Sequence, residues 1–270
     1  MSTHRLTCHP GIEYANVAGF RPLELDLYLP GPEARIADPP VVVHVHGGGW
    51  RRGSRRHPLP AVSGGFYAEL AGHGIVVAAI DYRLSGEARY PAAVDDVRAA
   101  VTWVRASLGK YGIGHGPVAL WGDSAGGHLA LQAALTGTAV EGVVAWFPVT
   151  DLTSTGGEAD EDPGSREALF LGAPPSRVPE LAWDASPIAH VHAGAPPMLV
   201  MHGDADTMVP TDQSIRFARA VREAGGQAEL VLVPGAAHFW DGAADVPAIV
   251  ARSTDFVCSL SRTTPAFPLS

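Results

Sequence analysis

The sequence is poor in cysteine and has no long apolar run. Its two cysteines, Cys8 and Cys258, lie near opposite ends of the 270 residues, so we predict two free thiols and a reducing, cytoplasmic location. No run of about 18 apolar residues is present that could span a membrane, and no apolar signal segment follows Met1. We therefore expect neither a membrane-bound nor a secreted protein.

Basic charge is also scarce. With 19 Lys and Arg residues against 28 Asp and Glu residues, the formal net charge is -9. An acidic surface of this kind repels a phosphate backbone, which argues against a nucleic-acid partner. Only 17% of the residues are charged and 46% are hydrophobic, so the chain can bury a large core. We predict one domain that covers residues 1–270.

Apolar runs alternate with helical patterns along the chain. Residues 23–29 alternate in polarity and predict a half-exposed antiparallel edge strand, while the segment up to residue 18 is expected to add another edge strand or to cover the sheet. Continuous apolar runs are typical of parallel strands that are buried on both faces, and they occur at residues 41–45, 75–80, 118–120, 142–147, 198–201 and 230–233. Helical spacing predicts helices at residues 91–108, 124–135, 211–224 and 247–260. The fold class is therefore α/β, with a mostly parallel sheet of about eight strands and helices on both faces.

One stretch departs from this alternation. Residues 151–192 are rich in glycine, proline, serine and acidic residues, with a short helical segment at residues 166–171. The stretch has too few apolar residues to form a core of its own. We predict a lid-like insertion over the active site.

Ser124 stands between two glycines, in the order Gly122-Asp123-Ser124-Ala125-Gly126. The pattern G-x-S-x-G is typical of a sharp turn between a strand and a helix, which exposes the serine hydroxyl at the end of the sheet. A serine in that position is placed to attack a carbonyl. The pattern is short and also occurs by chance, so its meaning depends on the rest of the chain.

A run of glycines follows the strand predicted at residues 41–45. Successive glycines let the backbone approach a ligand closely, so that N–H groups can point at a developing negative charge. We predict an oxyanion hole that is formed by the N–H groups of Gly48, Gly49 and Ala125.

A nucleophilic serine also needs a base and an acid that orients the base. His238 follows the strand predicted at residues 230–233 and is the candidate base. Asp206 follows the strand at residues 198–201 and is the candidate acid, with Asp204 as the weaker choice. The order Ser, Asp, His, with each member after its own strand, is the order of α/β-hydrolases.

At these motifs the chain resembles the α/β-hydrolase carboxylesterases, which include hormone-sensitive-lipase-like esterases, bacterial acetyl and feruloyl esterases and kynurenine formamidases. The resemblance covers about residues 23–256 and is carried by His46-Gly47-Gly48-Gly49-Trp50, Asp81-Tyr82-Arg83-Leu84, Gly122-Asp123-Ser124-Ala125-Gly126-Gly127, Ser186-Pro187-Ile188 and His202-Gly203-Asp204-Ala205-Asp206. The residues after Leu84 are similar to the short, feruloyl-esterase-like branch. The resemblance implies an α/β-hydrolase fold and esterase chemistry, but it does not fix the substrate.

We therefore expect a serine carboxylesterase that acts on small-molecule esters with short acyl or aryl groups, through Ser124, Asp206 and His238 and without a cofactor or metal. One alternative is an arylformamidase, amidase or peptidase that uses the same triad. Another is a non-catalytic ligand-binding protein on a hydrolase fold, and the presence of His238 argues against it.

Other conspicuous residues receive structural interpretations. His44 and His46 lack a nearby third ligand, so His46 is expected to support the glycine loop rather than to bind zinc. Asp123 is expected either to tune the serine turn or to make a local hydrogen bond. Asp81 and Arg83 are expected to brace the sheet through a buried ion pair or hydrogen bonds.

Several polar and aromatic side chains flank the predicted site loops. A solvated loop is favoured over an attractor of acidic substrates for the run that contains Arg51, Arg52, Arg55 and Arg56. Trp50 and Phe239, each next to a site loop, are the best candidates for substrate contacts. Exposed edge strands and the C-terminal helix offer surfaces for a homodimer.

Overall fold

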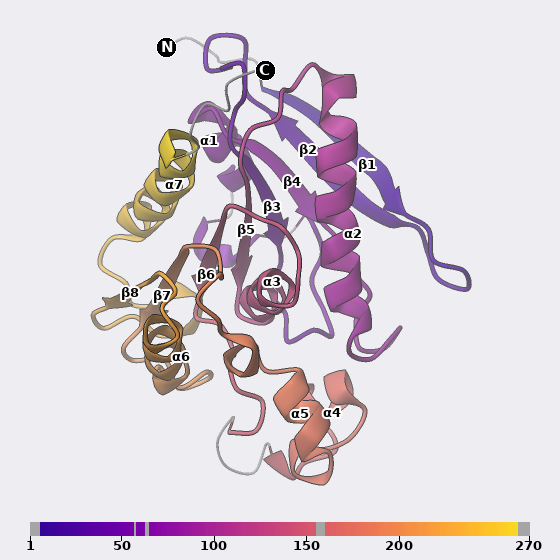
Figure 1. The fold of residues 1–270 in the computed structure, drawn as a ribbon, viewed down its shortest axis with the longest axis vertical. Helices are drawn as coiled ribbons and strands as arrows, with labels where there is room; N and C mark the ends of the chain where they lie inside the picture. The colour runs from indigo at the N-terminus through magenta and orange to yellow at the C-terminus, as the bar shows by residue number, and fades with distance from the viewer. Residues whose placement is uncertain (1–5, 57, 63–64, 155–159, 264–270) are drawn as a thin grey trace.

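The computed structural model describes residues 6–56, 58–62, 65–154 and 160–263, and its centre is an eight-stranded sheet (Figure 1). The strand order is β1-β2-β4-β3-β5-β6-β7-β8. β2 pairs antiparallel with both β1 and β4, and every other neighbouring pair is parallel. The strands are β1 (Thr7–Ala15), β2 (Leu23–Leu29), β3 (Val41–Val45), β4 (Val76–Ile80), β5 (Val118–Asp123), β6 (Gly142–Trp146), β7 (Met198–Gly203) and β8 (Ala228–Val233). The mixed, mostly parallel sheet confirms the predicted fold class.

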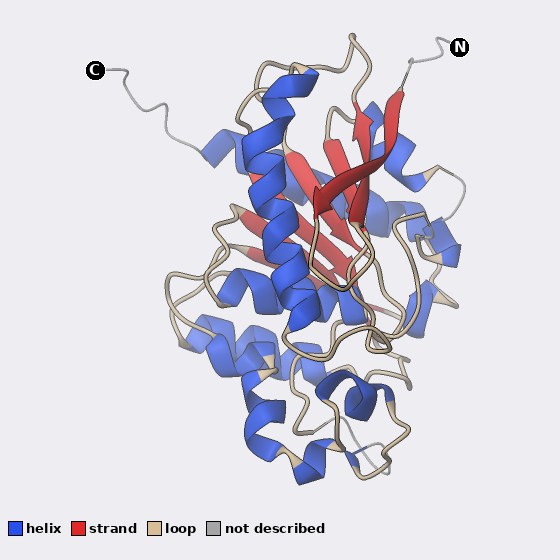
Figure 2. Ribbon diagram, turned by 90° about the vertical axis from the view of Figure 1, so that its right-hand side faces the viewer, coloured by secondary structure: helices blue, strands red, loops and turns tan. Residues whose placement is uncertain are grey.

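Helices cover both faces of the twisted sheet (Figures 1 and 2). α2, α3 and α6 contribute to the core on one face, and α1 and α7 contribute to the core on the other. The short helices α4 and α5 lie in the segment that was predicted as an insertion. The bounds are α1 (Phe66–Gly72), α2 (Ala92–Ser107), α3 (Ala125–Leu135), α4 (Arg166–Leu171), α5 (Pro179–Asp184), α6 (Asp212–Glu223) and α7 (Val246–Thr263).

The central strands are apolar at every position because both of their faces are covered. In β3, Val43 packs into the core beside α2 and α3, whereas its neighbour Val42 packs into the core beside α1 and α7, and both side chains are fully buried. Alternate side chains of a strand point to opposite faces, so a strand between two helical layers needs an unbroken apolar run. The parallel strands therefore match the sequence pattern that predicted them.

Two features of the fold differ from the sequence expectations. β2 is antiparallel as predicted, but it is an internal strand, because β1 forms the edge beside it. Helix α1 was not predicted, since its seven residues are too few for a clear helical period.

Cys8 and Cys258 are not joined to each other by a disulfide, as expected. Within the described ranges, no helix is both long and apolar enough to cross a membrane.

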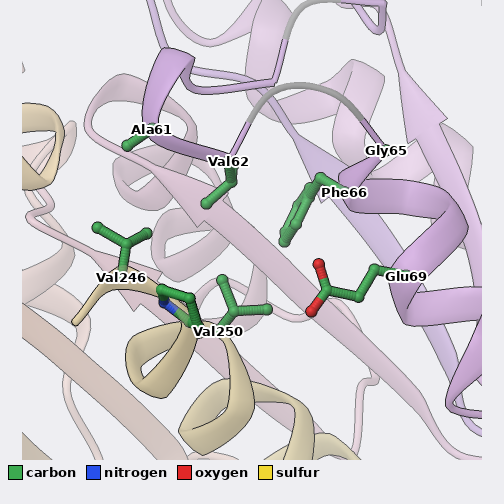
Figure 3. A pocket seen from close by; sticks show the side chains of 8 residues that line it. Ala61, Val62, Gly65, Phe66, Glu69, Val246 and Val250 are labelled. Carbon is green, nitrogen blue, oxygen red and sulfur yellow. The ribbon is translucent and has the colours of Figure 1, made fainter.

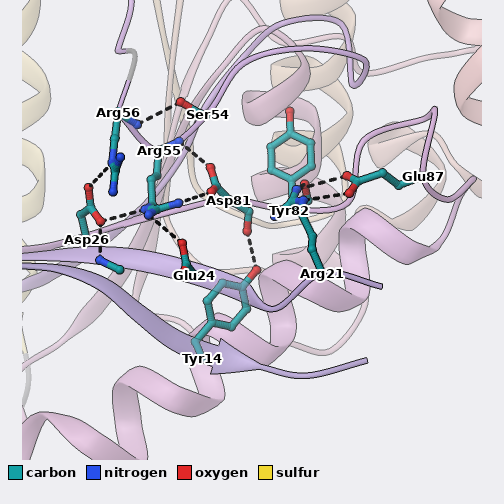
Figure 4. A network of polar contacts seen from close by, with 11 residues as sticks. Tyr14, Arg21, Glu24, Asp26, Ser54, Arg55, Arg56, Asp81, Tyr82 and Glu87 are labelled. Carbon is teal, nitrogen blue, oxygen red and sulfur yellow. Dashed lines mark hydrogen bonds and ion pairs between the residues drawn. The ribbon is translucent and has the colours of Figure 1, made fainter. Parts of the chain in front are cut away.

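Arg55 is buried in a network of carboxylates, so the interpretation of it as part of a solvated loop is wrong (Figure 4). Its Nε donates to Asp26 Oδ1 at 2.8 Å, one Nη lies 2.8 Å from Glu24 Oε2, and the other Nη and the backbone N–H both donate to Asp81. The network ties β2 to the turn after β4 and to the chain that leaves the glycine loop. Asp81 therefore braces the sheet as expected, and Arg83 does so separately by pairing with Asp96.

We expect Arg55→Ala to lower the free energy of unfolding by about 3–5 kcal/mol, because it leaves Asp26 and Asp81 without their buried cation. Arg56→Ala is the matched control: the Arg56 side chain is 60% exposed and contacts the same Asp26 at 3.4 Å. Its loss should cost less than about 1 kcal/mol. Urea denaturation of both variants at neutral pH measures the difference, and equal small losses would contradict the role given to Arg55.

Candidate active site

Ser124 occupies the turn between β5 and α3 in a strained backbone conformation. Its φ is 52° and its ψ is -118°, a region that residues with a side chain rarely adopt. A Cβ atom on Gly122 would lie 2.3 Å from the carbonyl carbon of Gly126, and one on Gly126 would lie 2.0 Å from the carbonyl oxygen of Val45. Both flanking positions therefore require glycine, as the pattern predicted.

The structure brings Ser124, His238 and Asp206 into one hydrogen-bonded line. Ser124 Oγ lies 3.0 Å from His238 Nε2, and His238 Nδ1 lies 2.6 Å from Asp206 Oδ2. Each residue follows the carboxyl end of a parallel strand, so the sheet holds the three together. Asp204 has a different contact, since its Oδ1 accepts the N–H of Gly235 at 2.7 Å.

Asp206 is held as a carboxylate by several donors. Burial raises its pKa, but hydrogen bonds from His202, His238 and the Val209 N–H outweigh burial and hold the pKa well below the usual range. Oδ1 accepts the N–H groups of Met208 and Val209 at 2.8 and 3.0 Å, and His202 Nε2 lies 3.2 Å from Oδ2. An ionised Asp206 fixes the proton on His238 Nδ1 and leaves Nε2 free to accept the serine proton. The sequence did not point to His202 as a partner of this acid.

The glycine loop after β3 has three successive residues with positive φ. The φ values are 120° at Gly48, 61° at Gly49 and 57° at Trp50. Gly48 and Gly49 line the same cavity as Ser124. In the part of the chain that the structure describes, the N–H groups of Gly48, Gly49 and Ala125 have no protein acceptor, which is the condition for binding an oxyanion.

Aromatic and histidine side chains support this loop from below. The His46 ring stacks on Tyr82 with centroids 4.3 Å apart, and its Nδ1 donates to the Gly47 carbonyl at 2.7 Å. The Tyr82 hydroxyl donates to the His46 carbonyl at 3.0 Å. These contacts agree with the expected supporting role of His46. Across the described residues, no three His, Cys, Asp or Glu side chains gather in a way that could hold a metal ion.

Asp123 lies behind the glycine loop. A Cβ atom on Gly47 would lie 2.2 Å from Asp123 Oδ2, so only glycine permits this approach. Burial raises the pKa of Asp123 to about 7, against the opposing effect of a hydrogen bond from the Gly47 backbone. His44 Nε2 is 3.9 Å from Asp123 Oδ1, and burial together with the neighbouring His46 lowers the pKa of His44 to about 3. Asp123 therefore makes the local hydrogen bond that was one of its two expected roles.

Trp50 lies outside the cavity, so its predicted contact with substrate is not seen. Its side chain is 1% exposed and stacks on Phe170 with centroids 4.8 Å apart. Its Nε1 donates to His128 Nδ1 at 3.1 Å, and His128 Nε2 donates to the Ala185 carbonyl at 2.8 Å. His128, which the sequence analysis did not single out, thus connects the glycine loop to the segment predicted as a lid.

The cavity in front of Ser124 has a volume of about 240 Å³. Phe239 contributes to its wall, and so does Arg166 from the predicted insertion. The lining residues are Gly48, Gly49, Arg51, Arg52, Ser124, Arg166, Met208 and Phe239.

A second cavity, of about 310 Å³, lies between α1 and α7, with the Glu69 carboxylate turned toward it (Figure 3). No member of the Ser124, His238 and Asp206 line borders this second cavity. The candidate active site is therefore identified by the arrangement of its polar groups and not by the size of its cavity.

The strand order, the serine turn and the Ser-His-Asp line together define an α/β-hydrolase. The chain belongs to the BD-FAE family, whose profile matches residues 25–221. Esterase LipQ of Mycobacterium tuberculosis is 33% identical over 222 residues, which are 77% of this chain and 52% of LipQ, so the chain spans about half the length of that relative.

Solved esterase structures match nearly the whole chain. A truncated carbohydrate esterase from gut microbiota has a TM-score of 0.83 and 28% identity, covering 95% of this chain and 97% of that one. An esterase of Thermogutta terrifontis, Est2, has a TM-score of 0.72 and 27% identity, covering 95% and 94% of the two chains. Structures of Est2 exist with propionate and with butyrate bound.

His128→Asn tests whether the buried imidazole is neutral. Burial lowers the pKa of His128 from 6.5 to about 4, although its hydrogen bond to Ala185 acts in the opposite direction. Between these two pH values the unfolded chain binds a proton at this histidine that the folded chain does not. The contribution of the neutral His128 to the free energy of unfolding is therefore fully present above pH 6.5 and is lost as the pH falls toward 4. As the pH falls within that window, we expect the free energy of unfolding of the variant to decrease by about 1.4 kcal/mol per pH unit less than that of the wild type.

The measurement is the free energy of unfolding from chemical denaturation at several pH values. His73→Asn, at an exposed position, is the control and should keep the wild-type slope. Equal slopes in His128→Asn and the wild type would contradict the assignment.

Proposed function

We propose that the protein is a serine carboxylesterase that hydrolyses short-acyl or aryl carboxylic esters. The observation that carries the proposal is the pair of contacts from His238, at 3.0 Å to Ser124 Oγ and at 2.6 Å to Asp206. A nucleophile, a base and an orienting acid in this geometry are the requirements of acyl transfer. The names of LipQ, of the gut carbohydrate esterase and of Est2 support esters as the bonds attacked.

In the first half of the reaction, His238 Nε2 takes the hydroxyl proton while Ser124 Oγ attacks the ester carbonyl. The tetrahedral oxyanion accepts hydrogen bonds from the N–H groups of Gly48, Gly49 and Ala125. His238 then gives the proton to the departing alcohol, and an acyl-enzyme remains. The ionised Asp206 stabilises the imidazolium while it carries the proton.

In the second half, a water molecule takes the place of the alcohol. His238 accepts a proton from the water as its oxygen attacks the acyl carbon, and the same N–H groups stabilise the second oxyanion. Collapse of this intermediate returns the proton to Ser124 Oγ and releases the carboxylic acid. These steps use only water and groups of this chain.

The dimensions of the site support small substrates. A cavity of about 240 Å³ fits a short acyl or aryl group but cannot enclose a long lipid chain. The propionate and butyrate held by Est2 are acids of the expected size. Arg166 lines the cavity from the segment of residues 151–192, which supports the proposal that this segment borders the active site.

Exchanges within the triad test the mechanism. We expect Ser124→Ala and Asp206→Asn each to lower kcat on p-nitrophenyl acetate by about 10⁴-fold or more, because one loses the nucleophile and the other loses the group that orients His238. Asp204→Asn is the matched control and should stay close to the wild type, since Asp204 contacts the Gly235 N–H and not the histidine. A fluorophosphonate probe should label Ser124 in the wild type, and folded protein without this label would contradict every serine-hydrolase reading.

A substrate panel tests the class of bond and the size of the acyl group. Turnover of p-nitrophenyl acetate and butyrate should exceed that of the laurate by about tenfold or more in kcat/KM, because the longer chain has no enclosed space. N-formylkynurenine is measured beside them. If the formamide were cleaved far faster than any ester, the protein would be an arylformamidase instead, and strong turnover of emulsified long-chain lipids would contradict the short-acyl preference.

A further inference from the structure

The cavity in front of Ser124 is strongly cationic. Among its lining residues are Arg51, Arg52 and Arg166, and none of the lining residues that the structure describes is acidic. This concentration is unexpected in a chain with a net charge of -9. Charges of one sign that line a cleft concentrate the field in it and attract ligands of the opposite sign.

Two of the three arginines lie directly against the predicted oxyanion glycines. A Cβ atom on Gly49 would lie 2.7 Å from Arg166 Cδ, and one on Gly48 would lie 3.1 Å from Arg52 Cγ. The aliphatic stems therefore pack on the loop that would hold the oxyanion. Arg52 is exposed and Arg166 is half-buried, and both line the cavity.

These arginines differ from their neighbours in their partners. Arg55 and Arg56 are paired with carboxylates of the sheet. No carboxylate in the described part of the chain pairs with Arg51 or Arg52. Among the described residues, Arg166 pairs with Glu167 at 3.4 Å and donates to the Met208 carbonyl at 3.5 Å, which leaves most of its N–H donors unused. Guanidinium groups with unused donors beside a cavity favour a carboxylate, which they can bind through two hydrogen bonds.

We propose that the substrate is an ester that also carries a carboxylate, which Arg51, Arg52 and Arg166 bind beside the scissile bond. The inference rests on the proposed esterase function and narrows its substrate class. The three arginines line the same cavity as Ser124, so the carboxylate can belong to the acyl part or to the alcohol part of the ester.

Two matched pairs of esters test the proposal and distinguish these sources. For the alcohol part, 4-acetoxybenzoate is compared with its methyl ester; for the acyl part, monophenyl adipate is compared with phenyl hexanoate. We expect at least about a tenfold advantage in kcat/KM for the anionic member of one pair at low ionic strength, after correction for buffer hydrolysis. The advantage should shrink in 0.5 M NaCl, because salt screens partly exposed charges.

Charge-removing variants assign the effect to the cavity. Arg52→Gln and Arg166→Gln should each lower the ratio of anionic to neutral kcat/KM by about fivefold, mainly through a higher KM for the anionic ester. Arg56→Gln removes a charge from the same loop but outside the cavity, and it should leave both substrates and the ratio unchanged.

The outcomes separate this proposal from the proposed function. Ratios near one for both pairs, with the neutral esters still turned over, would overturn the carboxylate proposal and leave the esterase intact. A ratio that falls equally in Arg56→Gln would also overturn it, because the effect would then come from overall charge. No turnover of any of the four esters by folded protein would overturn both proposals.

Discussion

The close approach of two backbones is the constraint on which the site depends. The turn after β5 packs so tightly on β3 that a single methyl group at Gly126 would lie 2.0 Å from the Val45 carbonyl. The same contact places the glycine loop, which continues β3, next to the serine turn. The Ser124 N–H also donates to the Trp146 carbonyl at 2.8 Å, so β6 fixes the turn from its other side. Strain at Ser124 is tolerated because three strands determine its position together.

Buried polar contacts also fix the positions of the loops around the serine turn, which have no regular secondary structure. The glycine loop is bound to Tyr82 below and, through Trp50 and His128, to the segment that contributes Arg166. The chain that leaves the loop is held by Arg55 in the carboxylate network of the antiparallel strands. Such contacts are costly to leave incomplete, so each of them restricts the loop to one arrangement. The loop can then present its N–H groups without rearranging, as the proposed oxyanion stabilisation requires.

The parts that were predictable from sequence are those that a local pattern determines. Glycines at a strained turn, apolar runs in doubly covered strands and a histidine just after a strand each leave a signal within a few residues. Contacts between distant residues leave none: Trp50 and His128 are 78 positions apart, and Arg55 is 29 positions from Asp26. The internal position of β2 could not be predicted for the same reason. Asp26 gives β2 the polar pattern of an exposed strand, and the ion pair with the distant Arg55 that allows Asp26 to be buried leaves no local signal.

Burial and hydrogen bonding determine which ionisable groups near Ser124 carry a charge. Asp206 is anionic because donors surround it, and it bonds the Nδ1 side of His238, where a negative charge would stabilise the imidazolium of the proposed reaction. Asp123 lies behind the glycine loop, where a full negative charge would oppose an oxyanion. Burial raises its pKa to about 7, which favours the uncharged form of this carboxyl. Burial likewise favours the neutral form of His44, which is 3.9 Å from Asp123, and of His128, which is bonded to Trp50. The arginines that line the cavity are exposed or half-buried, so they retain their charge at a small desolvation cost and would attract an incoming anion.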